Sequence, residues 1–76
     1  MTKAERLEKR KLLRRRGKNI KAMRLREGLT RKEVANALKC KAAEIRRIEW
    51  GKVDLNLERL AELAVVFNCE IFDFLG

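Results

Sequence analysis

The sequence has no histidine and no proline, and its two cysteines stand 29 residues apart. Without histidine, no Ser/His/Asp set, Cys/His pair or HExxH zinc site can form, and the spacing of Cys40 and Cys69 excludes a CxxC motif. Both cysteines lie within apolar patterns, and we interpret them as small core residues rather than as a disulfide or a metal pair. We therefore expect no enzyme activity, no metal site, no cofactor and no small-molecule ligand.

Long hydrophobic runs are also missing. No apolar stretch approaches the ~20 residues that a membrane span requires, and no signal-peptide hydrophobic region is present. The length of 76 residues leaves room for one small domain, and a hydrophobic share of 46% is enough to give that domain a core. We expect a soluble, cytoplasmic protein without a membrane partner.

Positive charge dominates most of the chain. Lys and Arg number 20 against 11 Asp and Glu, which gives a net charge of +9. Residues 1–16 carry +6 and residues 19–52 carry a further +6, whereas residues 53–76 carry −4. This asymmetry indicates that one part of the molecule meets a polyanion, either nucleic acid or an acidic membrane surface, while the other part faces away from it.

The first 16 residues are predicted to form a flexible basic arm ahead of a domain at residues 17–76, because Leu7, Leu12 and Leu13 do not make a wide apolar stripe and Gly17 interrupts the run. One interpretation is a solvated, fraying arm. A second is an arm that tracks phosphates and becomes helical on binding. A membrane-surface helix is the third, although the segment lacks an aromatic anchor and a broad apolar face.

Helical signals begin at residue 19. The first helix is expected to stop at Gly28, a residue that readily adopts the left-handed conformation. Thr30 and Glu33 have the spacing of a capping box, and Leu29 and Val34 occupy the positions of a hydrophobic staple. These residues predict the start of a second helix.

Three further helices complete an all-α, five-helix expectation, because no segment alternates with a period of two. A third helix fits residues 42–50 and ends at Gly51. Asn56 is the predicted N-cap of a fourth helix, Asn68 is its predicted stop, and residues 71–75 suggest a short last helix. The fourth helix has a predicted apolar stripe made of Leu57, Leu60, Ala61, Ala64 and Phe67.

Residues 31–50 combine two helices with a tight connection. The small Ala35 allows the second helix to cross the first at a steep angle, with Val34, Leu38, Ile45 and Ile48 buried between them. A helix-turn-helix needs this geometry to place its second, recognition helix in the major groove of DNA. Any small helical domain with two crossing helices is the alternative.

Several segments together resemble the Cro-type, or xenobiotic-response-element (XRE) type, helix-turn-helix repressors of phages and bacteria. The resemblance runs from about Ile20 to Leu75. It is carried by Leu29-Thr30, Glu33-Val34-Ala35, Ile45-Arg46-Arg47-Ile48-Glu49, Gly51-Lys52 and Leu57-Glu58-Arg59-Leu60-Ala61. It implies a lambda-repressor-like domain that binds a palindromic operator as a homodimer, in a bacterial or phage-encoded protein that is nucleoid-associated when bound. It also implies a buried ion pair between Arg24 and Glu49.

The resemblance further implies DNA contacts. The base-reading candidates are Arg46, Arg47, Ala42 and Ala43. Arg46 is preferred over Arg47 as the base reader, because it lies one turn past Ala42 and Ala43, and guanine is its expected target. The two alanines could contact a thymine methyl. The phosphate candidates are Thr30, Arg31, Lys32, Lys41 and Lys52; to these the basic arm, which lies outside the resemblance, adds Arg14, Arg15 and Arg16.

Ala42 and Ala43 depart from the family pattern, because polar residues are common at those positions, and Lys39 and Lys41 depart from it as well. Lys39 stands where Gly is common, so a non-Gly residue is expected in the left-handed conformation at about 1 kcal/mol. Lys41 replaces the Ser or Thr cap of the recognition helix, at a loss of about 1 kcal/mol. Glu44 either compensates through the helix dipole or discriminates by accepting a hydrogen bond from cytosine.

Two aromatic residues have open roles. Trp50 is interpreted as a half-buried lid on the end of the recognition helix, and the alternatives are a phosphate contact and an interface anchor. Phe72 lies beside core positions and is the candidate for a dimer contact.

The function that fits best is a sequence-specific regulator of transcription, a repressor, with double-stranded DNA as its partner. A protein-interaction module of the antitoxin kind, with a protein partner, is one alternative. A nonspecific binder of nucleic acid, RNA included, is the other.

Overall fold

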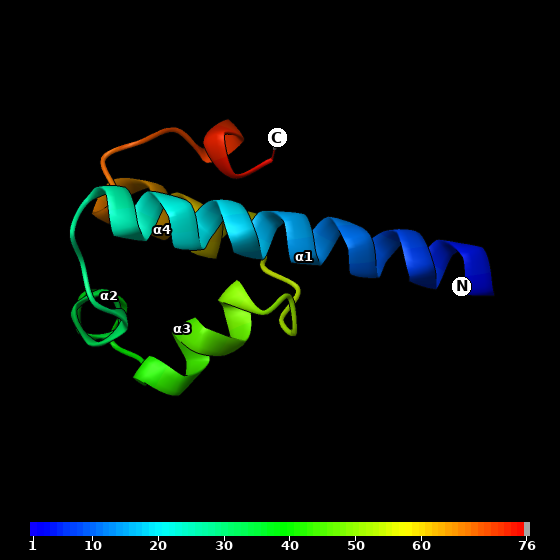
Figure 1. Cartoon of the computed structure of the whole chain (residues 1–76), viewed down its shortest axis with the longest axis horizontal. Coiled ribbons are helices and arrows are strands. Elements are labelled where there is room, and N and C mark those ends of the chain that lie inside the picture. The colour runs from blue at the N-terminus through cyan, green and yellow to red at the C-terminus, as the bar shows by residue number, and fades with distance from the viewer. Residues whose placement is uncertain (76) are drawn as a thin grey trace.

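The computed structural model describes residues 1–75, and these form a single bundle of helices without a strand (Figure 1). The elements in chain order are α1 (Lys3–Arg26), α2 (Arg31–Leu38), α3 (Ala42–Glu49), α4 (Leu57–Val66) and the 3₁₀ helix η1 (Ile71–Phe74). The all-α prediction is confirmed. The expected fifth helix is a single 3₁₀ turn, so the described chain has four α-helices rather than five.

Helix α1 differs from the prediction. Gly17 was expected to separate the basic segment from a first helix that starts at residue 19, but one helix runs through both. The helix begins at a capping box of Thr2 and Glu5 and continues for 24 residues, with Gly17 buried in its interior. A Cβ at Gly17 would lie 2.4 Å from the carbonyl oxygen of Glu49 and 2.8 Å from that of Ile48. Glycine is present here because α1 crosses the end of α3 backbone against backbone, and not because the helix stops.

Helices α2 and α3 begin and end as the local signals predict. The Thr30 hydroxyl accepts a hydrogen bond from the Glu33 N–H at 3.1 Å, and the Glu33 carboxylate accepts one from the Thr30 N–H at 2.9 Å. Lys39 ends α2 in the left-handed region, at φ 58° and ψ 45°. Lys41 precedes α3 without a side-chain cap, as expected.

Helix α4 and η1 close the core over α1. Asn56 caps α4 by accepting a hydrogen bond from the Arg59 N–H at 2.8 Å, and Asn68 follows the helix at φ 53°. The Asn19 side chain donates to the Phe74 carbonyl oxygen at 3.0 Å, which fastens η1 to α1. The core consists of Ile20, Val34, Ala35, Leu38, Ile45, Ile48, Leu60, Leu63, Ala64, Phe67 and Phe74.

The apolar stripe predicted for α4 is partly wrong. Leu57 is 70% exposed and Ala61 is half-buried, whereas Leu63, which lies outside the predicted stripe, is fully buried. Leu57, Ala61 and Val65 recur every four residues and so share one side of the helix, which borders the buried side. The consequence is an apolar ridge on the surface of α4.

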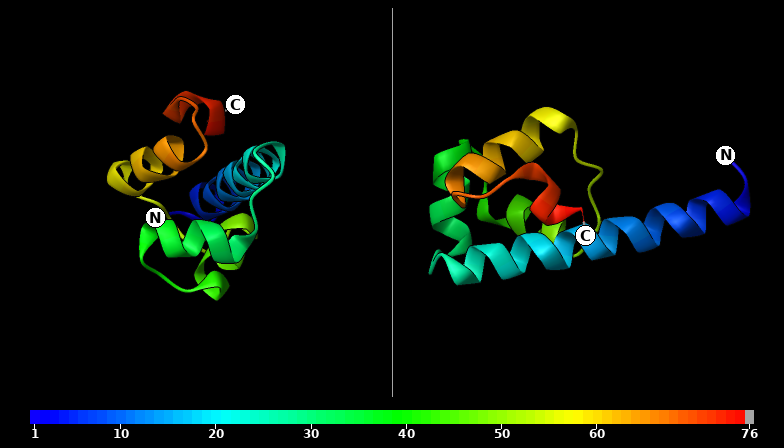
Figure 2. Two further views of the ribbon diagram at one scale, coloured as in Figure 1. Left: turned by 90° about the vertical axis from the view of Figure 1, so that its left-hand side faces the viewer. Right: turned by 90° about the horizontal axis from the view of Figure 1, so that it is seen from above.

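The N-terminal half of α1 extends beyond the rest of the molecule (Figures 1 and 2). Twenty-four helical residues span about 36 Å, which accounts for the longest dimension of the protein, 37 Å. Figure 1 shows α3 on one side of α1 and η1 on the other. Within residues 1–75, no helix has both the length and the apolar character needed to cross a membrane.

Candidate nucleic-acid interface

The predicted recognition helix is α3, and it has one buried and one exposed side. Ile45, Ile48 and Glu49 are buried against α1 and α2. Ala42, one of the predicted base-reading positions, is half-buried beside the core. The side chains that α3 and its end leave to solvent are those of Ala43, Arg46, Arg47 and Trp50.

Arg46 and Arg47 differ in their position on that exposed side. An α-helix turns about 100° per residue, so Arg47 lies about 200° from Ile45 and faces away from the core, whereas Arg46 lies about 100° from it, on the flank. The Arg46 guanidinium carbon lies 5.9 Å from the centre of the Trp50 ring, a cation–π contact. This contact draws Arg46 along the helix toward its C-terminal end.

A buried carboxylate joins three helices behind this face. Glu49, with a side chain 1% exposed, accepts hydrogen bonds from Arg24 at 2.6 and 3.3 Å, so the implied ion pair is present. It also accepts one from Arg31 Nε at 3.0 Å. Arg24 in turn donates to the Leu29 carbonyl oxygen at 2.8 Å. The network fixes the start of α2 and the end of α3 on α1.

The geometry is therefore two short helices at a fixed crossing, with an exposed arginine on the outer side of the second. A family model described as helix-turn-helix matches residues 20–74, most of the chain. The chain belongs to the helix-turn-helix family, of the Cro and XRE type. This is a DNA-binding, non-enzymatic class of regulatory domain. The comparison with curated proteins returns no match.

Arg31 has a second role that the sequence did not reveal. The helix-turn-helix resemblance implies a phosphate contact, but its Nε donates to Glu49, and its side chain is 31% exposed. A guanidinium has five N–H groups, so the partly exposed end can still donate to a phosphate while Nε holds Glu49. The pairing requires the start of α2 to meet the end of α3, a contact between distant residues that no local spacing signals.

The other phosphate candidates differ in how accessible they are to DNA. Arg16 is half-buried, and its Nε is buried without a hydrogen-bond partner, so it does not lie on the open surface with the others. The Thr30 hydroxyl is already occupied in capping α2, although the residue itself is exposed. The exposed cations of the set are Lys32, Lys41, Lys52, Arg14 and Arg15.

Trp50 is not the half-buried lid that was predicted, because it is 59% exposed. It follows Glu49, the last buried residue of α3, and its ring therefore extends past the end of the core. Together with Arg14, Lys18, Lys21 and Glu49 it lines a hollow of about 300 Å³ between α3 and α1. The end of the recognition helix is thus bordered by cations of α1.

Glu44 lies on the flank of α3 that faces α4. Its carboxylate is 4.0 Å from the Arg59 guanidinium, which also pairs with Glu62 at 3.3 Å. The angular spacing places Glu44 about 100° from Ile45, on the side opposite Arg46. The carboxylate therefore has a cationic partner within the domain.

The two cysteines are free thiols packed against the core. Burial raises the pKa of both the Cys40 and the Cys69 thiol, which keeps them protonated and unreactive at neutral pH. Their interpretation as small core residues agrees with these positions. No group of three or more potential metal ligands occurs within residues 1–75.

Proposed function

We propose that this helix-turn-helix protein is a sequence-specific regulator of transcription, a repressor that binds a palindromic DNA operator as a homodimer through the major groove. The observation that carries the proposal is the exposed outer side of α3, with Arg47 opposite the buried Ile45. The major groove is about 12 Å wide and admits one helix with its side chains.

Our proposal takes Arg47 as the base reader in place of Arg46, the residue preferred from sequence. It faces directly away from the core, and an arginine in that position can donate two hydrogen bonds to the O6 and N7 of guanine. Ala43 lies one turn earlier on the same side and would present its methyl group to a thymine. Arg46 is held on the flank by Trp50, where a phosphate is the closer target.

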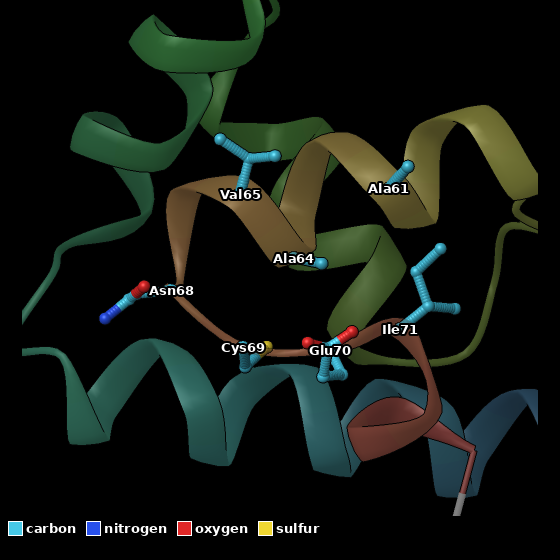
Figure 3. Close-up of a pocket in the computed structure, with 7 residues that line it drawn as sticks. All are labelled: Ala61, Ala64, Val65, Asn68, Cys69, Glu70 and Ile71. Atoms are coloured by element: carbon cyan, nitrogen blue, oxygen red, sulfur yellow. The ribbon is translucent and has the colours of Figure 1, made fainter.

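The proposed dimer uses the apolar surface of α4 and η1. Leu57, Val65 and Phe72 are 70%, 81% and 69% exposed, an unusual concentration for so small a domain. A groove of about 490 Å³ runs between α4 and the loop to η1 (Figure 3). It is lined by Ala61, Ala64, Val65, Asn68, Cys69, Glu70 and Ile71.

The charge around this surface affects how the dimer forms. Residues 53–76 carry −4, so two copies that meet through α4 and η1 bring like charges together. Salt screens that repulsion, and added salt is therefore expected to tighten the free dimer while it weakens DNA binding. Sedimentation of the wild-type chain and of Phe72→Glu over a range of salt concentrations tests the surface.

The central experiment is selection from a random duplex library at about 150 mM salt. We expect an enriched palindrome with half-sites about one helical turn apart. Arg47→Ala is expected to cost about 1–3 kcal/mol on that operator and to relax preference at one position of each half-site. Arg46→Ala is the matched control and is expected to weaken operator and random DNA alike.

Each alternative function has its own outcome in this experiment. Strong binding without an enriched sequence would make the protein a nonspecific nucleic-acid binder. Absence of DNA binding would favour a protein-interaction module. Loss of sequence preference in Arg46→Ala but not in Arg47→Ala would show that the two arginines have been assigned the wrong way round.

A further inference from the structure

The N-terminal half of α1 is a helix fixed to the domain. A Cβ at Gly51 would lie 2.9 Å from the Arg14 backbone, so residues 13–17 and residues 48–51 touch with no side chain between them. Farther out, Lys9 pairs with Asp54 at 2.9 Å. The direction in which the extension leaves the domain is therefore set by the crossing at Gly17.

All the charged residues on one side of this helix are basic, and the exposed Leu7 and Leu25 lie among them. At about 100° per residue, Arg14 and five other cations within about 60° of it around the axis make a set of six, whereas Glu5 and Glu8 lie about 180° and 120° from Arg14. All six are exposed. They are Lys3, Arg10, Lys11, Arg14, Lys18 and Lys21, and we call this set the basic face of α1.

The basic face adjoins the recognition helix. Its three C-terminal members, Arg14, Lys18 and Lys21, line the hollow beside Trp50 at the end of α3. Gly17, which touches the carbonyl oxygen of Glu49, lies about 60° from Arg14, so the α3 side of the helix borders the basic face. The cations are continuous with the flank of α3 that carries Arg46 and Trp50.

The depth of the major groove places this face near the phosphates. Packed helices lie about 8–10 Å apart, and the major groove is about 8.5 Å deep. A helix that packs directly behind one inserted in the groove is therefore level with the phosphate ridge that borders it. From Lys3 to Lys21 the basic face is about 27 Å long, the axial length of about eight base pairs.

We propose that the basic face of α1 binds the phosphate backbone of the same DNA duplex that α3 enters, as a rigid extension of the interface beyond the helix-turn-helix. This inference rests on the proposed function, since α3 must lie in the groove for α1 to meet the ridge. It assigns the phosphate contacts to one side of α1, and excludes Arg15 and Arg16, which lie about 100° and 160° away from Arg14.

The test compares two double variants that remove equal charge from exposed positions of the same helix. Arg10→Gln with Arg14→Gln changes the basic face, and Arg15→Gln with Arg26→Gln changes other sides of α1. Affinity for the selected operator is measured against salt concentration. The face variant should lower the slope of log K against log salt by about 1.8, since each phosphate that is no longer neutralised reduces it by about 0.9, whereas the control should change it by less than half as much.

Circular dichroism confirms that both variants fold before the slopes are compared. Equal slopes for the two variants would overturn the inference, since diffuse charge alone would then explain the effect, and the proposed function would stand. If selection enriches no operator, the slopes are measured on a random duplex, where a difference between the variants would uphold the phosphate contact although sequence-specific function fails. Binding to phosphatidylserine vesicles in preference to DNA, with the same loss in the face variant, would also overturn it.

Discussion

Replacing Gly17 with alanine separates two explanations of this glycine. If Gly17 only weakened the helix, alanine would stabilise the protein by about 1 kcal/mol through its higher helix propensity. The structure gives the opposite sign. The added methyl group would lie 2.4 Å from the Glu49 carbonyl oxygen, and the backbone atoms on both sides of the contact cannot move away by changing rotamer.

The magnitude follows from the cost of overpacking. Such insertions cost about 1–3 kcal/mol, and a backbone contact belongs at the upper end, so the net change after the propensity gain is about 2 kcal/mol of destabilisation. For a domain of this size, that corresponds to a fall of about 8–16 °C in Tm. The displacement would also strain the bond between Arg24 and Glu49, which depends on the same approach of α1 to α3.

Urea denaturation followed by circular dichroism measures the effect. Ala22→Gly, at an exposed position of the same helix, calibrates the propensity term and should cost about 1 kcal/mol. A Gly17→Ala protein as stable as the wild type, or more stable, would refute the backbone crossing of α1 and α3.

Three further predictions concern the network and the caps. Glu49→Leu should destabilise the fold by about 3–5 kcal/mol in urea denaturation, because Arg24 would remain buried without its partner; an unchanged midpoint would contradict the role of the pair. Lys39→Gly should stabilise by about 1 kcal/mol, since φ 58° strains a residue that carries a Cβ, and a loss of stability would argue against that conformation. Hydrogen bonds from the Thr30 backbone N–H and the Thr30 hydroxyl lower the pKa of Glu33 below 4.5, so its contribution is present above that pH and is lost as pH falls through the lower folded value. In Glu33→Gln, the free energy of unfolding should therefore fall less steeply as the pH is lowered. An unchanged dependence on pH would show that the Glu33 cap does not contribute to the loss of stability in acid.

The features that could be predicted from sequence are those determined by neighbouring residues. The capping box of Thr30 and Glu33, the left-handed Lys39 and Asn68, and the uncapped start of α3 all depend on contacts within a few residues, and all are present. Hydrophobic spacing also identified most of the core.

The predictions that were wrong concern residues whose surroundings are set by distant parts of the chain. Gly17 looked like a helix breaker, because nothing near it in sequence indicates that the end of α3 lies against it. Trp50 was interpreted as a lid because it directly follows the buried residues of the recognition helix, but its side chain is exposed. The choice between Arg46 and Arg47 is a separate case: the preference for Arg46 rested on its position one turn past Ala42 and Ala43, whereas our proposal of Arg47 rests on which side of α3 is buried.

The crossing at Gly17 also determines where the cooperative folding unit begins. Gly51 packs on the backbone of Leu13 and Arg14, so the turn after α3 depends on residues that precede Gly17. A shortened chain that starts at Gly17 would keep every residue of the helix-turn-helix. It would lose the backbone of Leu13 and Arg14, against which the turn at Gly51 packs. We therefore expect the smallest chain that folds on its own to start at least a full helical turn before the segment that matches the family.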